Sequence, residues 1–452
     1  MKPADPGQRK IGILGVGREG QAVRRYLQSL YPDMVLDLIT ESPPDAEFTA
    51  ALPESDRVIC GPLSRVALAG YDLLIRSPGI SPYRQSIQRA KLAGVEITTP
   101  SNLWFAAHPQ EKTICVTGTK GKSTTSTLIA HALQSCGHRV RLAGNIGLPL
   151  LSCDDRNVDW WVIELSSYQL ADLVAAPTVA LLLNLTAEHL DWHGGEQAYR
   201  SDKLRLAELT GNGLLVANAA DPSLNKALSK YSNIFWFNSA SGIHVEADSI
   251  FDGPQMLPVK LPEGLPGAHN LANTAAALTV LRVIGQDEQT ALRALSSFRS
   301  LPHRLQLVGE RSGMRFVNDS ISSTPVSTMA ALEALAGQSI TLIVGGLDRG
   351  LDWAPYMNAL QTNSAHAVIA IPENGRQILD TMRSTGIQPE AGLHQVAGLA
   401  EAVELARHIT PANGTVLLSP GAPSFPQFKD YRDRGKQFAN LCGFELEEHD
   451  IW

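Results

Sequence analysis

A glycine-rich turn with two lysines lies at residues 118–124, in the order Gly118-Thr119-Lys120-Gly121-Lys122-Ser123-Thr124. Glycines let backbone N–H groups approach a phosphate closely, and a lysine followed by a hydroxyl supplies a cation and a magnesium ligand. The pattern is shorter than the usual phosphate loop, because only two residues separate the first glycine from the Gly-Lys pair. The apolar run 113–116 predicts a strand before the turn, and the run 126–133 predicts a helix after it. This setting predicts a site for ATP or GTP.

Two further side chains of this region follow apolar runs that predict strands. Glu164 ends the run 160–164, and a carboxylate there suits magnesium beside a phosphate loop. His189 follows the run 179–186, where it fits either a metal ligand or the partner of a carboxylate.

The sequence indicates less about the roles of two more polar residues. Asn145 belongs to a second glycine turn, residues 143–147. Lys203 lies in the polar segment 199–205, and composition alone makes it a solvated surface lysine.

The N-terminal part of the chain carries a second glycine fingerprint. Gly15-Val16-Gly17-Arg18-Glu19-Gly20 follows the predicted strand 11–14 and precedes a predicted helix, as in dinucleotide-binding turns. The acid expected after the second strand is ambiguous between Asp37 and Glu41, so another nucleotide diphosphate fits as well as a hydride carrier. Ser77-Pro78-Gly79 follows a later strand, at the edge where open α/β sheets bind ligands.

The composition is that of an ordinary soluble globular protein. The chain has 452 residues, 44% of them hydrophobic, which is enough for two to four domains. A net charge of −7 argues against a broad nucleic-acid-binding surface. The five cysteines show no Cys-x-x-Cys spacing, which favours reduced thiols. No leader and no apolar run of about 18 residues is present, so we expect a cytoplasmic protein without membrane insertion.

The pattern of strands and helices predicts an α/β fold with three domains. Apolar runs at 314–317, 340–344, 368–371 and 415–418 alternate with helical segments in the C-terminal third. We therefore expect a Rossmann-like N-terminal domain (1–101), a central P-loop ATPase-type domain with a mostly parallel sheet (102–300) and a C-terminal Rossmann-like domain (301–452). Three such units suit an enzyme that brings three substrates together.

The motifs taken together resemble the Mur ligase family, and within it the glutamate-adding ligases. The resemblance extends over nearly the whole chain and rests on these motifs: the turn at 118–124, Gly144-Asn145-Ile146-Gly147, Glu164-Leu-Ser-Ser, Asn184-Leu-Thr-Ala-Glu-His189-Leu-Asp191, His269-Asn270-x-x-Asn273, Pro302-His303-Arg304, Asn318-Asp319-Ser320 and the segment 419–431.

The resemblance implies an ATP-dependent, ADP-forming ligase of peptidoglycan precursor synthesis. ATP would phosphorylate the terminal carboxylate of UDP-N-acetylmuramoyl-L-alanine, and the amine of glutamate would attack the acyl phosphate. A carbamate on the lysine at position 203 would convert a cation into a metal-binding anion. Because Arg304 and Asp319 flank the hinge and belong to the expected nucleotide site, we also predict that the last domain closes onto the middle one when ATP binds.

The resemblance also implies the roles of individual residues. Catalytic residues would be Lys122, Lys203 and His189. ATP would contact Gly118, Thr119, Lys120, Gly121, Lys122, Ser123, Thr124, Asn270, Asn273, Arg304 and Asp319. Magnesium would be held by Ser123, Glu164, His189 and Lys203. The UDP-substrate would contact Gly15, Gly17, Arg18, Glu19, Ser77, Gly79 and Asn145. Glutamate would contact Ser323, Arg349, Ser424 and Tyr431.

One loop departs from the usual glutamate-adding pattern. A lysine near the amino-acid site is replaced by Ile321, Pro325 restricts the loop, and Arg349 stands where the family has a second lysine. The loop resembles that of a subfamily which adds L-glutamate and depends on a separate epimerase. We favour L-glutamate and keep D-glutamate as the alternative.

Three other functions have weaker support. A folylpolyglutamate synthase-like ligase would lack the first domain. An NAD-dependent oxidoreductase would need a clear ribose-binding acid and no separate phosphate loop. A nucleotide-dependent switch would bind ATP without turnover.

Overall fold

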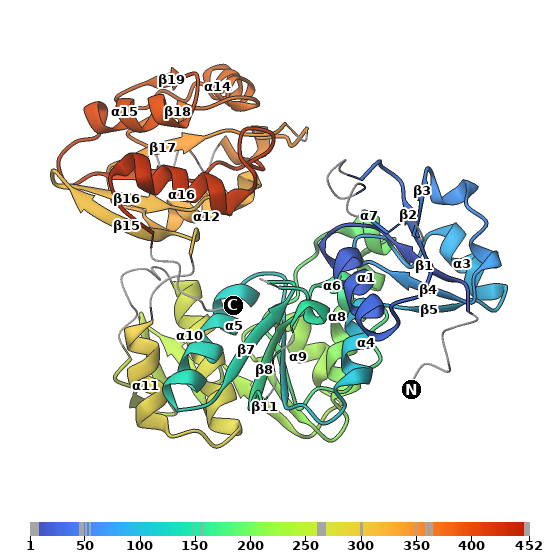
Figure 1. Cartoon of the computed structure of the whole chain (residues 1–452). Helices are drawn as coiled ribbons and strands as arrows, with labels where there is room; N and C mark the ends of the chain where they lie inside the picture. Colours follow the sequence, from blue (N-terminus) through green and yellow to red (C-terminus); the bar gives the residue numbers. More distant parts are fainter. Residues whose placement is uncertain are drawn as a thin grey trace. The chain divides into compact units, whose positions relative to one another are not determined.

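The computed structural model describes residues 9–44, 49, 52–53, 56–146, 148–153, 155, 157–259, 268–298, 302–348, 350–357, 360 and 365–446. These residues form two compact units (Figure 1). Unit 1 contains the residues as far as Val259 together with Leu271–Ser296. Unit 2 contains the residues from Ser297 onward together with the first turn of helix α10 (Ala268–Val283).

The first sheet of unit 1 is parallel throughout, in the order β3-β2-β1-β4-β5. Its strands are β1 (Ile11–Leu14), β2 (Leu36–Thr40), β3 (Arg57–Cys60), β4 (Leu73–Arg76) and β5 (Glu96–Thr98), and its helices include α1 (Arg18–Leu30) and α3 (Gln85–Leu92). The strand order reverses between β1 and β4, so the loops that follow these two strands open the crevice where such sheets bind ligands.

The second sheet of unit 1 is also parallel and has the order β11-β10-β9-β6-β8-β7. Its strands are β6 (Thr113–Thr117), β7 (Val140–Gly144), β8 (Trp160–Glu164), β9 (Val179–Leu182), β10 (Leu214–Asn218) and β11 (Ile234–Phe237). The central strands are buried on both faces, which explains their continuous apolar sequences. The carboxyl ends of β6, β7, β8 and β9 therefore deliver their loops to one edge.

Helices surround this second sheet, and a small antiparallel sheet follows it. The helices are α4 (Pro100–Ala107), α5 (Lys122–Ser135), α6 (Ser167–Leu170), α7 (Leu190–His193), α8 (Glu196–Thr210), α9 (Pro222–Leu228) and α11 (Glu288–Ser297), and the small sheet contains β12 (Ile243–Glu246), β13 (Ser249–Asp252) and β14 (Gln255–Met256).

Unit 2 contains a sheet in the order β15-β16-β20-β17-β18-β19, in which β15 alone is antiparallel to its neighbour. Its elements are β15 (Gln306–Arg311), β16 (Met314–Asn318), α12 (Pro325–Ala334), β17 (Ile340–Val344), β18 (Ala367–Ala370), α14 (Gly375–Ser384), β19 (Leu393–Gln395), α15 (Leu399–Ile409), β20 (Thr415–Leu418) and α16 (Tyr431–Cys442). Figure 1 shows α14 and α15 beside β18 and β19. The loops after β16, β20 and β17 lie next to one another, because these three strands are adjacent.

The fold confirms the predicted α/β class, and most predicted strands lie within one or two residues of the observed ones. The predicted domain boundary at 101/102 falls inside α4, and the one at 300/301 lies outside the described residues. Within the part of the chain that the structure describes, no helix is both long and apolar enough to cross a membrane.

Candidate functional site

The phosphate loop at 118–121 makes a tight turn between β6 and α5. Gly121 has a φ of +84°, which favours glycine, and a Cβ at Gly118 would lie 2.8 Å from the Cβ of Leu183. Lys122 folds back over the turn, and its Nζ donates to the carbonyl oxygens of Gly118 at 2.9 Å and Thr119 at 3.0 Å. A cation thus lies at the N-terminus of a 14-residue helix, where free N–H groups and the helix dipole favour an anion.

The other residues predicted for this loop have different positions. Ser123 and Thr124 belong to the first turn of α5. The N–H of Thr119 donates to the carbonyl oxygen of Asn184 at 3.1 Å. The hydroxyl of Thr119 contacts the carbonyl oxygen of Thr186 and the hydroxyl of Tyr199. Lys120 is exposed and pairs with Glu188 at 2.9 Å. Thr119 therefore uses its own donors to shape the loop.

Lys203 is buried beside the phosphate loop, with 3% of its surface exposed. Its Nζ donates to the carbonyl oxygen of Gly118 at 2.7 Å, so two lysines meet one oxygen. Burial, and then the charge of Lys122, lowers the pKa of Lys203 to about 7. The interpretation of Lys203 as a solvated lysine was wrong, because the segment 199–205 lies within α8 and turns this face toward the sheet.

Glu164 ends β8 and has only 1% of its surface exposed. Its Oε1 accepts a hydrogen bond from Nδ2 of Asn145 at 2.6 Å, while its Oε2 is buried and has no partner among the described residues. A buried carboxylate oxygen without a partner is costly unless a cation binds it. Asn145, predicted for the UDP-substrate, therefore contacts the candidate magnesium carboxylate.

The oxygen donors offered by Glu164 and Ser123 are of a kind that fits a magnesium ion taking most of its ligands from phosphates and water. The described residues contain no group of three or more His, Cys, Asp and Glu side chains that could hold a metal by themselves. A free carboxylate oxygen at Glu164 and a hydroxyl at Ser123 are hard oxygen donors of the kind magnesium prefers.

His189 is half-exposed and lies at the start of α7 in a left-handed conformation, with a φ of +55°. Its Nε2 is 3.8 Å from Oε2 of Glu188, and its ring faces Tyr168 with the centroids 5.1 Å apart. Partial burial lowers the pKa of His189, so the ring is neutral and has a lone pair at neutral pH. A neutral ring is compatible with either of the roles that the sequence left open.

The two loops of the first domain predicted to bind the UDP-substrate contact each other at the carboxyl ends of β1 and β4. Gly15 has a φ of +88°, and its carbonyl oxygen accepts a hydrogen bond from the hydroxyl of Ser77 at 3.0 Å. A Cβ at Gly20 would clash with that same carbonyl, so the third glycine of the fingerprint is required for close packing. Gly17 and Gly79 are exposed beside them.

Three acids near these loops have definite environments. Arg18 and Glu19 open α1, and burial raises the pKa of Glu19 to about 7. The ambiguous ribose-binding acids are both occupied, since Asp37 accepts from Tyr71 at 2.7 Å and Glu41 pairs with Arg84 at 2.6 Å. Both carboxylates therefore already have partners within the protein.

Asn270 and Asn273 are buried in α10. Within unit 1, the side chain of Asn273 lies against Gly121, where a Cβ would collide with its amide oxygen. This contact places a predicted ATP residue at the phosphate loop.

Asp319 follows β16 in unit 2 and is buried. It accepts hydrogen bonds from the hydroxyl groups of Ser322 and Ser419 and from the N–H of Leu305. Burial raises the pKa of Asp319 to about 6, although the nearby Arg304 opposes the shift. Arg304 itself has a buried Nε without a partner among the described residues.

The predicted glutamate residues lie on neighbouring loops of unit 2. Ser323 is in the loop after β16, Ser424 is in the loop after β20, and Tyr431 begins α16. The carbonyl oxygen of Tyr431 accepts from the hydroxyl of Ser320 at 2.8 Å, which joins two of these loops. Arg349 lies outside the described residues, as does Gly147 of the second glycine turn. Pro325 is the first residue of α12, with Thr324 as its N-cap.

Sequence reasoning missed Arg434, a buried cation beneath these loops. Its side chain is fully buried, its Nε donates to the hydroxyl of Ser320 at 3.0 Å, and its Nη2 donates to the carbonyl oxygens of Ser320 at 2.8 Å and Ala422 at 3.0 Å. It therefore ties the loop after β16 to the loop after β20. No local pattern marks an arginine that becomes buried only when strands a hundred residues apart in sequence pair.

Comparison with known families gives three consecutive matches. The models match the Mur ligase MurD-like N-terminal domain over residues 9–99, the Mur ligase middle domain over 116–281 and the Mur ligase glutamate ligase domain over 303–422.

Relatives of similar length are also found. A Xylella fastidiosa protein named UDP-N-acetylmuramoyl-L-alanine--L-glutamate ligase is 41% identical over 452 residues, covering 97% of this chain and 96% of the relative. A Micromonospora protein of the same name is 37% identical, covering 97% of each.

Solved structures share the fold at low sequence identity. UDP-N-acetylmuramate-alanine ligase of Thermotoga maritima aligns with a TM-score of 0.60 at 21% identity, covering 96% of this chain and 99% of the other. MurF ligase of Thermotoga maritima, solved in complex with ADP, aligns with a TM-score of 0.58 at 16% identity, covering 97% and 98%. The three domain matches and the full-length relatives show that this chain belongs to the Mur ligase family of ATP-dependent, amide-forming ligases.

Proposed function

We propose that the chain joins L-glutamate to the terminal carboxylate of UDP-N-acetylmuramoyl-L-alanine, with ATP as the energy source and magnesium as the metal ion. One observation carries the proposal: the side-chain nitrogens of Lys122 and Lys203 converge on the carbonyl oxygen of Gly118, and the charge of the buried Glu164 acts on Lys203. Such an array of opposite charges suits a reaction in which phosphate and carboxylate anions approach each other.

The proposed reaction has two steps. A carboxylate oxygen of the substrate attacks the γ-phosphorus of ATP, the bond to the bridging oxygen breaks, and ADP leaves. The neutral amine of glutamate then attacks the acyl carbon, the tetrahedral intermediate expels phosphate, and the nitrogen loses a proton. Magnesium would neutralise the phosphate charges during the first step.

The residues of this chain divide this work among themselves. We assign the phosphates to residues 118–124 with Lys122, and the metal to Ser123, Glu164 and His189. Lys203, whose lowered pKa makes its neutral amine available, would accept carbon dioxide as a carbamate and complete that set.

The remaining assignments concern the other two substrates and the nucleotide base. The UDP part would bind the loops of Gly15–Gly20 and Ser77–Gly79. The adenine, ribose and phosphate contacts of ATP would come from Asn270, Asn273, Arg304 and Asp319. Glutamate would bind the loops that Arg434 ties together, at Ser323, Ser424 and Tyr431, together with Arg349.

L-Glutamate is favoured over D-glutamate by the loop that follows Asp319. Ile321 leaves this loop without the usual lysine, and the relatives that match over the full length are named for L-glutamate. An L-glutamyl product implies a separate epimerase in the same cell, and a pathway that consumes ATP and a UDP-sugar belongs in the cytoplasm.

Phosphate release tests the proposed function. The purified protein is mixed with ATP, magnesium and UDP-N-acetylmuramoyl-L-alanine, and L-glutamate or D-glutamate is added in parallel. We expect release with L-glutamate, and none when any single substrate is omitted or EDTA is added. Release with D-glutamate alone would contradict the stereochemical assignment, and release with neither would contradict the proposed substrate.

A further inference from the structure

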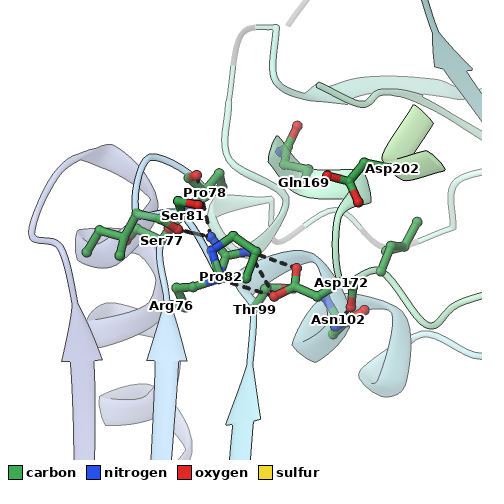
Figure 2. A network of polar contacts seen from close by, with 12 residues as sticks. Arg76, Ser77, Pro78, Ser81, Pro82, Thr99, Asn102, Gln169, Asp172 and Asp202 are labelled. Atoms are coloured by element: carbon green, nitrogen blue, oxygen red, sulfur yellow. Dashed lines mark hydrogen bonds and ion pairs between the residues drawn. The ribbon is translucent and has the colours of Figure 1, made fainter. Parts of the chain in front are cut away.

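A buried arginine fastens the substrate loop of the first domain to the middle domain (Figure 2). Arg76 is fully buried at the end of β4. Its Nη2 donates to both carboxylate oxygens of Asp172 at 2.8 Å, while its Nη1 donates to the carbonyl oxygens of Ser77 and Ile80. The side-chain amide of Asn102 donates a hydrogen bond to the carbonyl oxygen of Asp172 at 2.8 Å. The guanidinium therefore sets both the shape of the loop and its position on the middle domain.

The same loop is held to the short helix α7, which starts directly after His189. The indole N–H of Trp192 donates to the carbonyl oxygen of Gly79 at 3.0 Å, and the hydroxyl of Ser81 donates to the carbonyl oxygen of Trp192 at 2.6 Å. The ring of Trp192 stacks on the ring of Tyr168, with the centroids 4.1 Å apart, and the ring of Tyr168 also packs against that of His189. A movement of the loop must therefore move the turn that carries His189.

A chain of four side chains continues from the loop to the helix that carries Lys203. The hydroxyl of Tyr83 donates to Oδ1 of Asp202 at 2.6 Å, Oδ2 of Asp202 contacts Nδ1 of His193 at 2.6 Å, and Nε2 of His193 contacts the hydroxyl of Ser167 at 3.0 Å. We call these four residues the Tyr83 relay. Asp202 directly precedes Lys203, and Ser167 begins α6 just after Glu164.

The order Ser167–His193–Asp202 is also that of a hydrolytic triad, but the contacts around it favour another use. All three residues are buried, and the second oxygen of Asp202 is occupied by Tyr83. Tyr83 extends the chain of contacts from Asp202 to the first-domain loop, a link that a hydrolytic triad does not need, so we assign the chain to positioning.

We propose that the Tyr83 relay is a positioning device of the ligase, in which Tyr83 and Asp202 align Lys203 with the phosphate loop when the first-domain loop is in place. The inference rests on the proposed function. The hydrogen bond from Lys203 to Gly118 has a length of 2.7 Å, and a shift of the helix by about 1 Å misplaces a reacting group enough to slow catalysis strongly. Every link in the relay is shorter than about 3.1 Å, so the displacement of one end is transmitted to the other.

The test is Tyr83→Phe, which removes one hydroxyl and keeps the ring that packs edge-on against Trp192. Tyr71→Phe is the matched control. The hydroxyl of Tyr71 also donates to a carboxylate, that of Asp37 at 2.7 Å, but Tyr71 precedes β4 and so lies at the amino end of the first sheet, away from the loop. We expect Tyr83→Phe to lower kcat about tenfold and to raise KM for the UDP-substrate, with unchanged binding of ATP alone. The control variant should keep the kinetic constants of the wild type.

Two results would overturn the relay: kinetic constants for Tyr83→Phe that match those of the wild type, or equal changes in both variants. Asp202→Asn provides a second variant, in which the side chain keeps its shape and loses its charge, and it should lower kcat in the same way.

Hydrogen exchange of the α8 amides separates failure of the relay from failure of the proposed function. Exchange in residues 199–206 should be faster in Tyr83→Phe than in Tyr71→Phe even without substrates. If the wild type does not turn over, the proposed function fails and this comparison alone decides the relay. Equal exchange in the two variants would then refute it.

Discussion

Replacing Lys203 by methionine should stabilise unit 1 while abolishing turnover. Methionine keeps most of the volume of the side chain and removes its charge. Burial lowers the pKa of Lys203 from 10.5 to about 7, and each pKa unit corresponds to about 1.4 kcal/mol, so the buried ammonium costs about 4 kcal/mol near pH 7. Loss of the hydrogen bond to Gly118 offsets about 1 kcal/mol of this gain. The net expectation is about 3 kcal/mol of added stability for the variant.

The sign with pH follows from the lowered pKa. Below about pH 7 the folded state must hold a charged Lys203, so the full cost applies. Above it the folded lysine is neutral, and the cost decreases as the pH approaches 10.5, the pKa of lysine in the unfolded chain. The stability advantage of Lys203→Met should therefore shrink steadily between about pH 7 and pH 10. Taking the difference between variant and wild type cancels the other groups that titrate in this range.

Urea unfolding in bicarbonate-free buffer measures this difference. Five of the seven tryptophans lie between residues 104 and 236, so tryptophan fluorescence mainly reports unit 1. Lys226→Met, at an exposed position, is the control and should change stability little. A Lys203→Met protein that is less stable than the wild type near pH 7, or whose advantage does not change with pH, would refute the reasoning.

Three further variants test separate parts of the account. Asp319→Asn should gain stability relative to the wild type as the pH rises from about 3 to 7, by about 3 kcal/mol, because the unfolded wild type releases this carboxyl proton near pH 4 and the folded protein only near pH 6; a constant difference across unfolding curves in this range would contradict this. Glu19→Gln should abolish a rise in KM for the UDP-substrate above about pH 7, since the ionised Glu19 of the wild type would repel the diphosphate; identical pH profiles would speak against it. Arg434→Lys should cost about 2 kcal/mol in urea unfolding and raise KM for glutamate but not for ATP, because one ammonium cannot replace the guanidinium fork; an unchanged KM for glutamate would separate Arg434 from the amino-acid site.

Local features of the site could be predicted from the sequence. The phosphate loop is defined by a strand, two glycines and a helix start within a few residues, so its geometry follows from the local sequence. Glu164 ends an apolar strand of unit 1 and Asp319 follows one of unit 2, and within each sheet the parallel strands bring their carboxyl ends to one edge.

Features that depend on distant contacts could not be predicted. Lys203 stands in a helix whose residues are polar enough for a surface, and only the packing of α8 against the sheet buries it. Tyr83 and Asp202 are 119 residues apart, and neither belongs to a recognisable motif. Charged side chains that become buried through tertiary packing leave no periodic signal in a single sequence.

The central claim is that a carboxylate is activated by phosphate transfer at the phosphate loop, beside Lys122 and Lys203. The direct test uses UDP-N-acetylmuramoyl-L-alanine with heavy oxygen in its terminal carboxylate, incubated with ATP, magnesium, L-glutamate and the enzyme. Mass spectrometry of the released phosphate should show one heavy oxygen atom per turnover, because the carboxylate oxygen that attacks phosphorus leaves with the phosphate. Product formation with phosphate that contains only ordinary oxygen would contradict an acyl phosphate and the mechanism built on it.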